Sequence, residues 1–189
     1  MSVTKPIQIA VLIGTTRVQR RSIQAARLVA EEGRKLEGVE ITLVDPMDFD
    51  FPGDGNDPEG RDPRYTALTA RAEAFFIVVS EYNHSFPASV KRMLDSEFEN
   101  YVHKPVAFAG VSNSAWGGVR AIEALVNAVR EMGMVATATD VHFPRVQDLF
   151  DEHGRLLDAR IRDRIGWTYA ELIWMAKVLR WGREHLPGE

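Results

Sequence analysis

The sequence predicts an α/β fold in which a five-stranded parallel sheet carries helices on both faces, with residues 1–189 forming one domain. Apolar runs rich in Val, Ile and Phe alternate with helical patterns along the chain, and such alternation is typical of parallel sheets. A chain of 189 residues is also long enough to bury one sizeable core. Right-handed crossovers leave few topologies, and a three-layer sandwich with strand order 2-1-3-4-5 is favoured.

Composition excludes several classes of function. The chain has 23 basic and 27 acidic residues, a net charge of −4, so the charge balance argues against a nucleic-acid partner. It has no cysteine, which excludes disulfides, thiol nucleophiles and cysteine-ligated metals. No run approaches the ~20 apolar residues of a membrane span, and the start lacks a signal-peptide pattern. We therefore expect a cytoplasmic protein with no membrane association.

The first strand and helix favour an anion site. Residues 7–13 are a mostly apolar run typical of a strand buried on both faces, and a helical pattern spans residues 22–36. The first N–H groups of such a helix lack internal partners, and its dipole adds positive potential. Hydroxyls and a guanidinium nearby would complete a phosphate cradle, whereas a tight turn with solvated arginines is the alternative. The loop carries Thr15, Thr16, Arg17, Arg20, Arg21 and Ser22.

The remaining elements follow in order. After a strand over residues 39–44 comes a long loop, 45–64, with four prolines and seven acidic side chains. We expect this loop to be mostly solvated, with Phe49 and Phe51 packed against the body. Helices are then expected over residues 65–74, 88–98, 119–132 and 158–185, and strands over 75–79, 105–111 and 135–141.

Three polar loops should meet at one edge of this sheet, where ligands of such folds bind. A GxGxxG fingerprint and a Walker A lysine are both absent, which favours a mononucleotide phosphate over a pyrophosphate. Glycines and polar groups of the other two loops could hold a planar ring, and a phosphate with a planar polar ring describes FMN. Each residue also has a plainer interpretation, such as an exposed loop acid for Glu81 or a helix start for the glycines. The second loop offers Glu81, Tyr82, Asn83, His84 and Ser85, and the third offers Ser112, Gly117 and Gly118.

Metal and hydrolytic sites are poorly supported. The five histidines show no metal-ligand spacing on one helix, so no metal ligands are assigned. No serine lies in a G-x-S-x-G elbow.

Three motifs resemble those of the NADPH-dependent FMN reductases of flavodoxin-like fold, a family that includes quinone, azo-dye and chromate reductases. Residues 14–17 (GTTR) resemble the family's G-S-x-R phosphate loop. Residues 81–87 (EYNHSFP) resemble its E-Y-N-x-S-x-P segment, although Ser80 replaces the usual preceding proline. Residues 110–112 with the glycine pair at 117–118 resemble its G-x-S…G-G loop, in which Trp116 is unusually bulky.

The resemblance implies an FMN-dependent enzyme that takes a hydride from NADPH or NADH and passes electrons to a small acceptor, such as a flavin, quinone or azo compound, by a ping-pong mechanism. It implies no catalytic side chain, and a homodimer or homotetramer. A flavodoxin-type electron carrier and a non-catalytic FMN-binding protein are the alternatives. The implied FMN residues are Thr15, Arg17 and Ser22 at the phosphate, with Arg20 as a further candidate; Glu81, Tyr82, Asn83 and Ser85 along the ring and ribityl chain; and Ser112 and Gly117 at the far edge of the ring.

The last helix carries a wide apolar stripe. Trp167, Trp174 and Trp181 are seven residues apart, so they share one face. Part of the stripe should dock on the sheet, and we expect part of it to form a seam between subunits.

Overall fold

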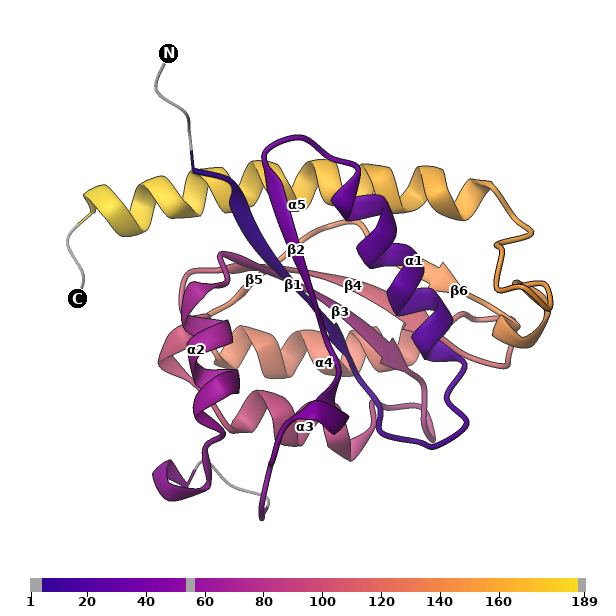
Figure 1. The fold of residues 1–189 in the computed structure, drawn as a ribbon, viewed down its shortest axis with the longest axis horizontal. Coiled ribbons are helices and arrows are strands. Elements are labelled where there is room, and N and C mark those ends of the chain that lie inside the picture. The colour runs from indigo at the N-terminus through magenta and orange to yellow at the C-terminus, as the bar shows by residue number, and fades with distance from the viewer. Residues whose placement is uncertain (1–4, 54–56, 187–189) are drawn as a thin grey trace.

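The computed structural model describes residues 5–53 and 57–186. Its sheet is parallel throughout and has the order β2-β1-β3-β4-β5, which confirms the predicted topology (Figure 1). The central strands are apolar and almost completely buried, as expected for strands covered on both faces. The four longer strands are β1 (Ile7–Ile13), β2 (Val39–Val44), β3 (Ala74–Ser80) and β4 (Pro105–Val111).

The expected fifth strand is split in two. β5 (Val135–Ala136) and β6 (Val141–Phe143) each pair with β4, and the chain leaves the sheet between them. The carboxylate of Glu171 accepts hydrogen bonds from the backbone N–H groups of Ala138 (2.8 Å) and Thr139 (3.2 Å) in this gap. A side chain therefore satisfies donors that a continuous strand would have paired with its neighbour.

In the described part of the chain, five α-helices cover the sheet in two layers (Figure 1). α1 and α5 pack on one face, and α2, α3 and α4 cover the other. Several helices end a few residues earlier than the sequence pattern indicates. α2 begins two residues earlier than expected, because the Asp62 side chain accepts a hydrogen bond from the N–H of Arg64 (2.9 Å) and so caps the N-terminus of the helix. The helices are α1 (Ser22–Arg34), α2 (Pro63–Arg71), α3 (Ala88–Asp95), α4 (Val119–Glu131) and α5 (Arg160–His185).

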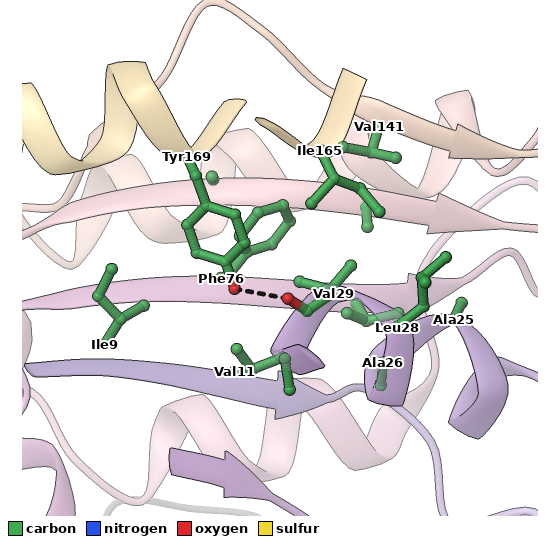
Figure 2. Packing of buried hydrophobic residues seen from close by; sticks show 14 of the residues in the cluster. Ile9, Val11, Ala25, Ala26, Leu28, Val29, Phe76, Val141, Ile165 and Tyr169 are labelled. Atoms are coloured by element: carbon green, nitrogen blue, oxygen red, sulfur yellow. Dashed lines mark hydrogen bonds between the residues drawn. The ribbon is translucent and has the colours of Figure 1, made fainter. Parts of the chain in front are cut away.

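Each face of the sheet has its own core. Under α1 and α5, the Tyr169 hydroxyl donates to the Val29 carbonyl (2.9 Å), and the Tyr169 ring packs on Phe76 (Figure 2). On the other face Phe49 and Phe51 make edge contacts with the buried Tyr65, so the expected packing of these two rings is confirmed.

α5 is fastened to the start of the sheet by Arg180. Its guanidinium donates to the carbonyls of Lys5 (2.9 Å) and Pro6 (3.0 Å) and forms an ion pair with Glu73, just before β3. Glu73 in turn accepts from the N–H of Gln8 (3.1 Å). Within the described residues, no helix is long and apolar enough to cross a bilayer.

Candidate functional site

The loops that follow β1, β3 and β4 enclose a cavity of about 530 Å³ at the carboxyl edge of the sheet. This volume lies in the range of sites for small molecules and cofactors. Eight of the ten predicted site residues line it, and Ser85 and Gly117 do not. The lining consists of Thr15, Arg17, Gln19, Arg20, Arg21, Ser22, Ser80, Glu81, Tyr82, Asn83, Val111, Ser112, Asn113 and Val146.

The first loop leaves β1 at a position that only glycine can occupy. The N–H of Gly14 donates to the Val78 carbonyl (2.9 Å), and a Cβ at Gly14 would lie 2.9 Å from that same oxygen. The next residue, Thr15, is buried, and its hydroxyl accepts from the N–H of Arg17 (3.3 Å). The same hydroxyl lies 3.1 Å from the hydroxyl of Tyr82, so the first and second loops are joined at the cavity.

The three arginines of the first loop are in different electrostatic situations. Arg20 forms an ion pair with Asp45 and donates to the Thr15 carbonyl (3.0 Å). Arg21 donates to the Gln147 carbonyl (3.1 Å). For the Arg17 guanidinium, no hydrogen bond or ion pair forms with any residue that the structure describes. Arg17 therefore has its whole guanidinium available to an anion in the cavity, whereas Arg21 has one donor engaged and Arg20 is already paired with an acid.

Two buried oxygens in the cavity lack partners among residues 5–53 and 57–186: the Ser22 hydroxyl and Oε2 of Glu81. The other carboxylate oxygen, Oε1 of Glu81, accepts from Nη1 of Arg120 (3.2 Å), and the Glu81 side chain is only 8% exposed. The interpretation of Glu81 as an exposed loop acid is therefore wrong. Because buried polar atoms are normally hydrogen-bonded, these two oxygens indicate a ligand.

FMN fits this set of groups. Its phosphate can accept from the Ser22 hydroxyl and from Arg17, and no side chain caps the N-terminus of α1 beside them. The ribityl hydroxyls and the ring N–H can donate to Glu81.

The second loop is a tight turn that projects from β3. The backbones of Tyr82 and Ser85 exchange two hydrogen bonds (2.8 and 2.9 Å). Between them Asn83 (φ +50°) and His84 (φ +62°) are left-handed, a conformation that costs energy in residues other than glycine. Such strain is common at binding sites, and here it places Tyr82 and Asn83 on the cavity wall. Ser85 closes the turn outside the lining, and its contact with FMN stays a prediction.

The glycines of the third loop are required by packing within the protein. Gly117 (φ +60°) and Gly118 (φ +82°) are left-handed, and a Cβ at Gly117 would lie 2.8 Å from Cβ of His142. A Cβ at Gly118 would lie 2.4 Å from the N atom of Val111. The loop therefore packs directly on β4 and β6. Ser112 lines the cavity, whereas the contact of Gly117 with FMN stays a prediction.

One wall of the cavity could not be assigned from the sequence. Val146, in the short 3₁₀ turn Val146–Asp148 after β6, lines the cavity, and its N–H donates to the Ser112 carbonyl (3.1 Å). Residues 144–154 contain no serine or threonine and one glycine, Gly154 at their end, so no ligand-binding pattern marks them. Only their place after the last strand could have indicated a role, because all strand ends in a parallel sheet share that edge.

Comparisons with known proteins identify the family of this chain. The model of the NADPH-dependent FMN reductase family matches residues 7–148, which include all three loops. The chain belongs to this family. The reductase is 26% identical to the Probable NADPH:quinone oxidoreductase 1 of Oryza sativa subsp. japonica, over 84% of this chain and 86% of the relative. This protein is thus an NAD(P)H-dependent FMN reductase, with FMN as cofactor and NADPH or NADH as co-substrate.

Solved structures support the flavodoxin-like fold of this reductase. FerB, a flavoenzyme NAD(P)H:(acceptor) oxidoreductase from Paracoccus denitrificans, aligns with a TM-score of 0.70 at 20% identity, covering 90% of this chain and 98% of FerB. A flavodoxin from Pseudomonas aeruginosa aligns with a TM-score of 0.58 at 15% identity, covering 92% of this chain and 99% of that chain.

Proposed function

We propose that this FMN-dependent oxidoreductase passes electrons from NAD(P)H to a small acceptor, such as free flavin, a quinone or an azo compound, by a ping-pong mechanism. The observation that carries the proposal is a cavity formed by three strand-end loops, in which the Ser22 hydroxyl and one Glu81 oxygen are buried without partners. When bound there, FMN supplies the hydride-transfer chemistry.

The residues divide by the part of FMN that they would hold. Arg17, Ser22 and the buried Thr15 line the cavity at the start of α1, where an anion is favoured, and we assign them to the phosphate. Arg20 lines the same end but is already paired with Asp45. We assign the ring and ribityl chain to the residues of the other two loops, namely Glu81, Tyr82, Asn83, Ser85, Ser112 and Gly117.

No protein acid or base is needed for hydride transfer in this proposal. The chain's part is to hold the flavin in place and to leave space for donor and acceptor in turn. Tyr82 and Asn83 are exposed on the wall of the cavity, and we place the shared binding space beside them. Two substrates that use one space in succession give parallel lines in double-reciprocal plots, and intersecting lines would contradict this order.

We further propose that the protein assembles as a homodimer or homotetramer through α5. Trp167, Trp174 and Trp181 are 64, 66 and 55% exposed. They lie ~180° around the helix from the face that packs on the sheet. Exposed aromatic residues in a row are typical of contact surfaces between proteins.

Stopped-flow reduction of the FMN-loaded protein tests the function. Mixing with NADPH or NADH in the absence of oxygen should bleach the flavin absorbance, and a later mix with a quinone should restore it. Bound FMN that neither cofactor bleaches would favour the electron-carrier or non-catalytic alternatives. Failure to bind FMN at all would overturn the assignment of the cavity.

A further inference from the structure

Asp45 lies directly after β2 and reaches the first loop from a neighbouring strand. Its carboxylate forms an ion pair with Arg20, whose side chain is only 9% exposed. Asp45 does not line the cavity, whereas Arg20 does. The sequence pattern placed Asp45 among the solvated acids of the 45–64 loop, and this interpretation is wrong for its carboxylate.

Arg20 connects the two ends of the loop that would surround the phosphate. Its guanidinium donates to the Thr15 carbonyl (3.0 Å), and its N–H donates to the Arg17 carbonyl (3.2 Å). The Arg20 side chain therefore ties the end of the loop back to Thr15, and its backbone N–H closes the turn at Arg17. Asp45 binds Nη2 of the guanidinium while Nη1 donates to the Thr15 carbonyl, so the planar group is held at two points and its orientation depends on Asp45.

We propose that Asp45 is a positioning residue for FMN, which holds Arg20 so that Thr15 and Arg17 stay arranged around the phosphate. The inference rests on the proposed function, since it takes the first loop as the phosphate site. Arg20 acts here as a clamp of the loop, and Arg17 supplies the charge that meets the phosphate.

A purely electrostatic role for Asp45 makes the opposite prediction. Asp45 adds a negative charge near an anion site and occupies Arg20. If that were its whole effect, removing the charge would free Arg20 for the phosphate and tighten FMN binding. The positioning role instead predicts weaker binding after the same change.

The experiment measures the affinity of Asp45→Asn for FMN and for riboflavin, which lacks the phosphate, by fluorescence quenching. Asparagine keeps an oxygen for the N–H of Met47, which Asp45 accepts at 3.0 Å, so the local turn is retained. We expect the FMN Kd to rise about tenfold or more, as for loss of a charged hydrogen bond, while the riboflavin Kd changes by less than about twofold. Asp48→Asn, an exposed acid three residues along, is the matched control and should change neither Kd.

A double-mutant cycle tests whether Asp45 acts through Arg20. In an Arg20→Gln background, Asp45→Asn should produce no further loss of FMN affinity. Arg20→Lys keeps the charge but loses the fork, and it should reproduce the selective loss if Asp45→Asn does not fold. Tighter FMN binding, or equal weakening of FMN and riboflavin, would overturn the positioning role. Failure of the unmutated protein to prefer FMN to riboflavin would instead overturn the phosphate site on which the inference rests.

Discussion

At the level of single residues, the Ser22 hydroxyl is the group whose removal best separates ligand binding from stability. It is buried and has no hydrogen-bond partner within the described chain. The ligand-free protein is therefore less stable than it would be without this hydroxyl, because the group loses its water on folding and gains no hydrogen bond in return. Ser22→Ala removes this cost in stability along with the contact that we propose Ser22 makes to the phosphate.

We therefore expect Ser22→Ala to weaken FMN binding about tenfold while the ligand-free protein unfolds at the same or a higher temperature. Fluorescence titration and thermal unfolding followed by circular dichroism measure the two effects. Ser96→Ala is the control, since the Ser96 hydroxyl is buried but donates to the Met93 carbonyl (2.7 Å). That change should lower stability by about 1 kcal/mol and leave FMN binding unaltered. Lower stability of Ser22→Ala with unchanged affinity would contradict the assignment.

A second residue, Asp140, should make stability depend on pH. Burial raises the pKa of this carboxyl from 3.8 to about 6. His142 and Arg164 act to lower this pKa, whereas Glu123 and Glu171 raise it further. The unfolded chain loses the proton near pH 4, whereas the folded protein keeps it to about pH 6. The folded state thus binds more protons in this window, and its stability falls as the pH rises through it.

Asp140→Asn should therefore stabilise the protein at pH 8, by up to about 1 kcal/mol for a partly hydrated group, and have little effect at pH 4. Urea unfolding at both pH values measures the difference. Asp163→Asn, at an exposed position on α5, is the control, and it should not increase stability at pH 8 relative to pH 4. Equal gains at both pH values for Asp140→Asn would mean that burial of its charge is not the cause.

At the level of elements, the interrupted strand shows how a helix side chain can replace sheet pairing. The run 135–141 has the apolar ends of a strand, but Ala138 to Asp140 leave the sheet. The carboxylate of Glu171 on α5 accepts from two N–H groups there and from the Thr139 hydroxyl (2.6 Å). Nothing local to residues 135–141 indicates this partner, since it lies more than 30 residues away on another element.

Glu171→Gln should lower the free energy of unfolding by about 1–3 kcal/mol. The amide oxygen of glutamine is a weaker acceptor than a carboxylate oxygen, and the amide NH₂ group would face N–H and O–H donors that need an acceptor. Urea unfolding of the variant measures this loss. The matched control is Glu184→Gln, at an exposed position on the same helix. A loss for Glu171→Gln no larger than for the control would show that the gap is held by other contacts.

At the level of the whole molecule, the sequence predicts most of the arrangement. Strand order, the two covered faces and the meeting of three loops all follow from the alternation of elements. The contacts that join distant segments could not be predicted, because Asp45 with Arg20 and Glu81 with Arg120 have no sequence spacing that marks them. Helix ends were also too long by a few residues, since local propensity does not specify where packing stops.

The exposed tryptophans of α5 (Trp167, Trp174 and Trp181) should control the assembly of the protein. Trp174→Ala together with Trp181→Ala should reduce the mass of the particle in light scattering. These rings lie opposite the face that packs on the sheet and are exposed, so their removal should cost few contacts within one chain. Trp116→Ala removes a similarly exposed indole elsewhere and should leave the mass unchanged. A mass that the double substitution does not change would remove α5 from the interface.

The fastening of α5 to the first strand through Arg180 also bears on synthesis at the ribosome. β1 emerges before every other described element, whereas α5, which shares the cover of its face of the sheet with α1, emerges after all of them. A nascent chain therefore leaves the part of this apolar face that lies under α5 uncovered until α5 has been made. Slow or interrupted translation would expose that surface to aggregation, and chaperones that shield emerging apolar segments would matter more for this protein than its modest size suggests.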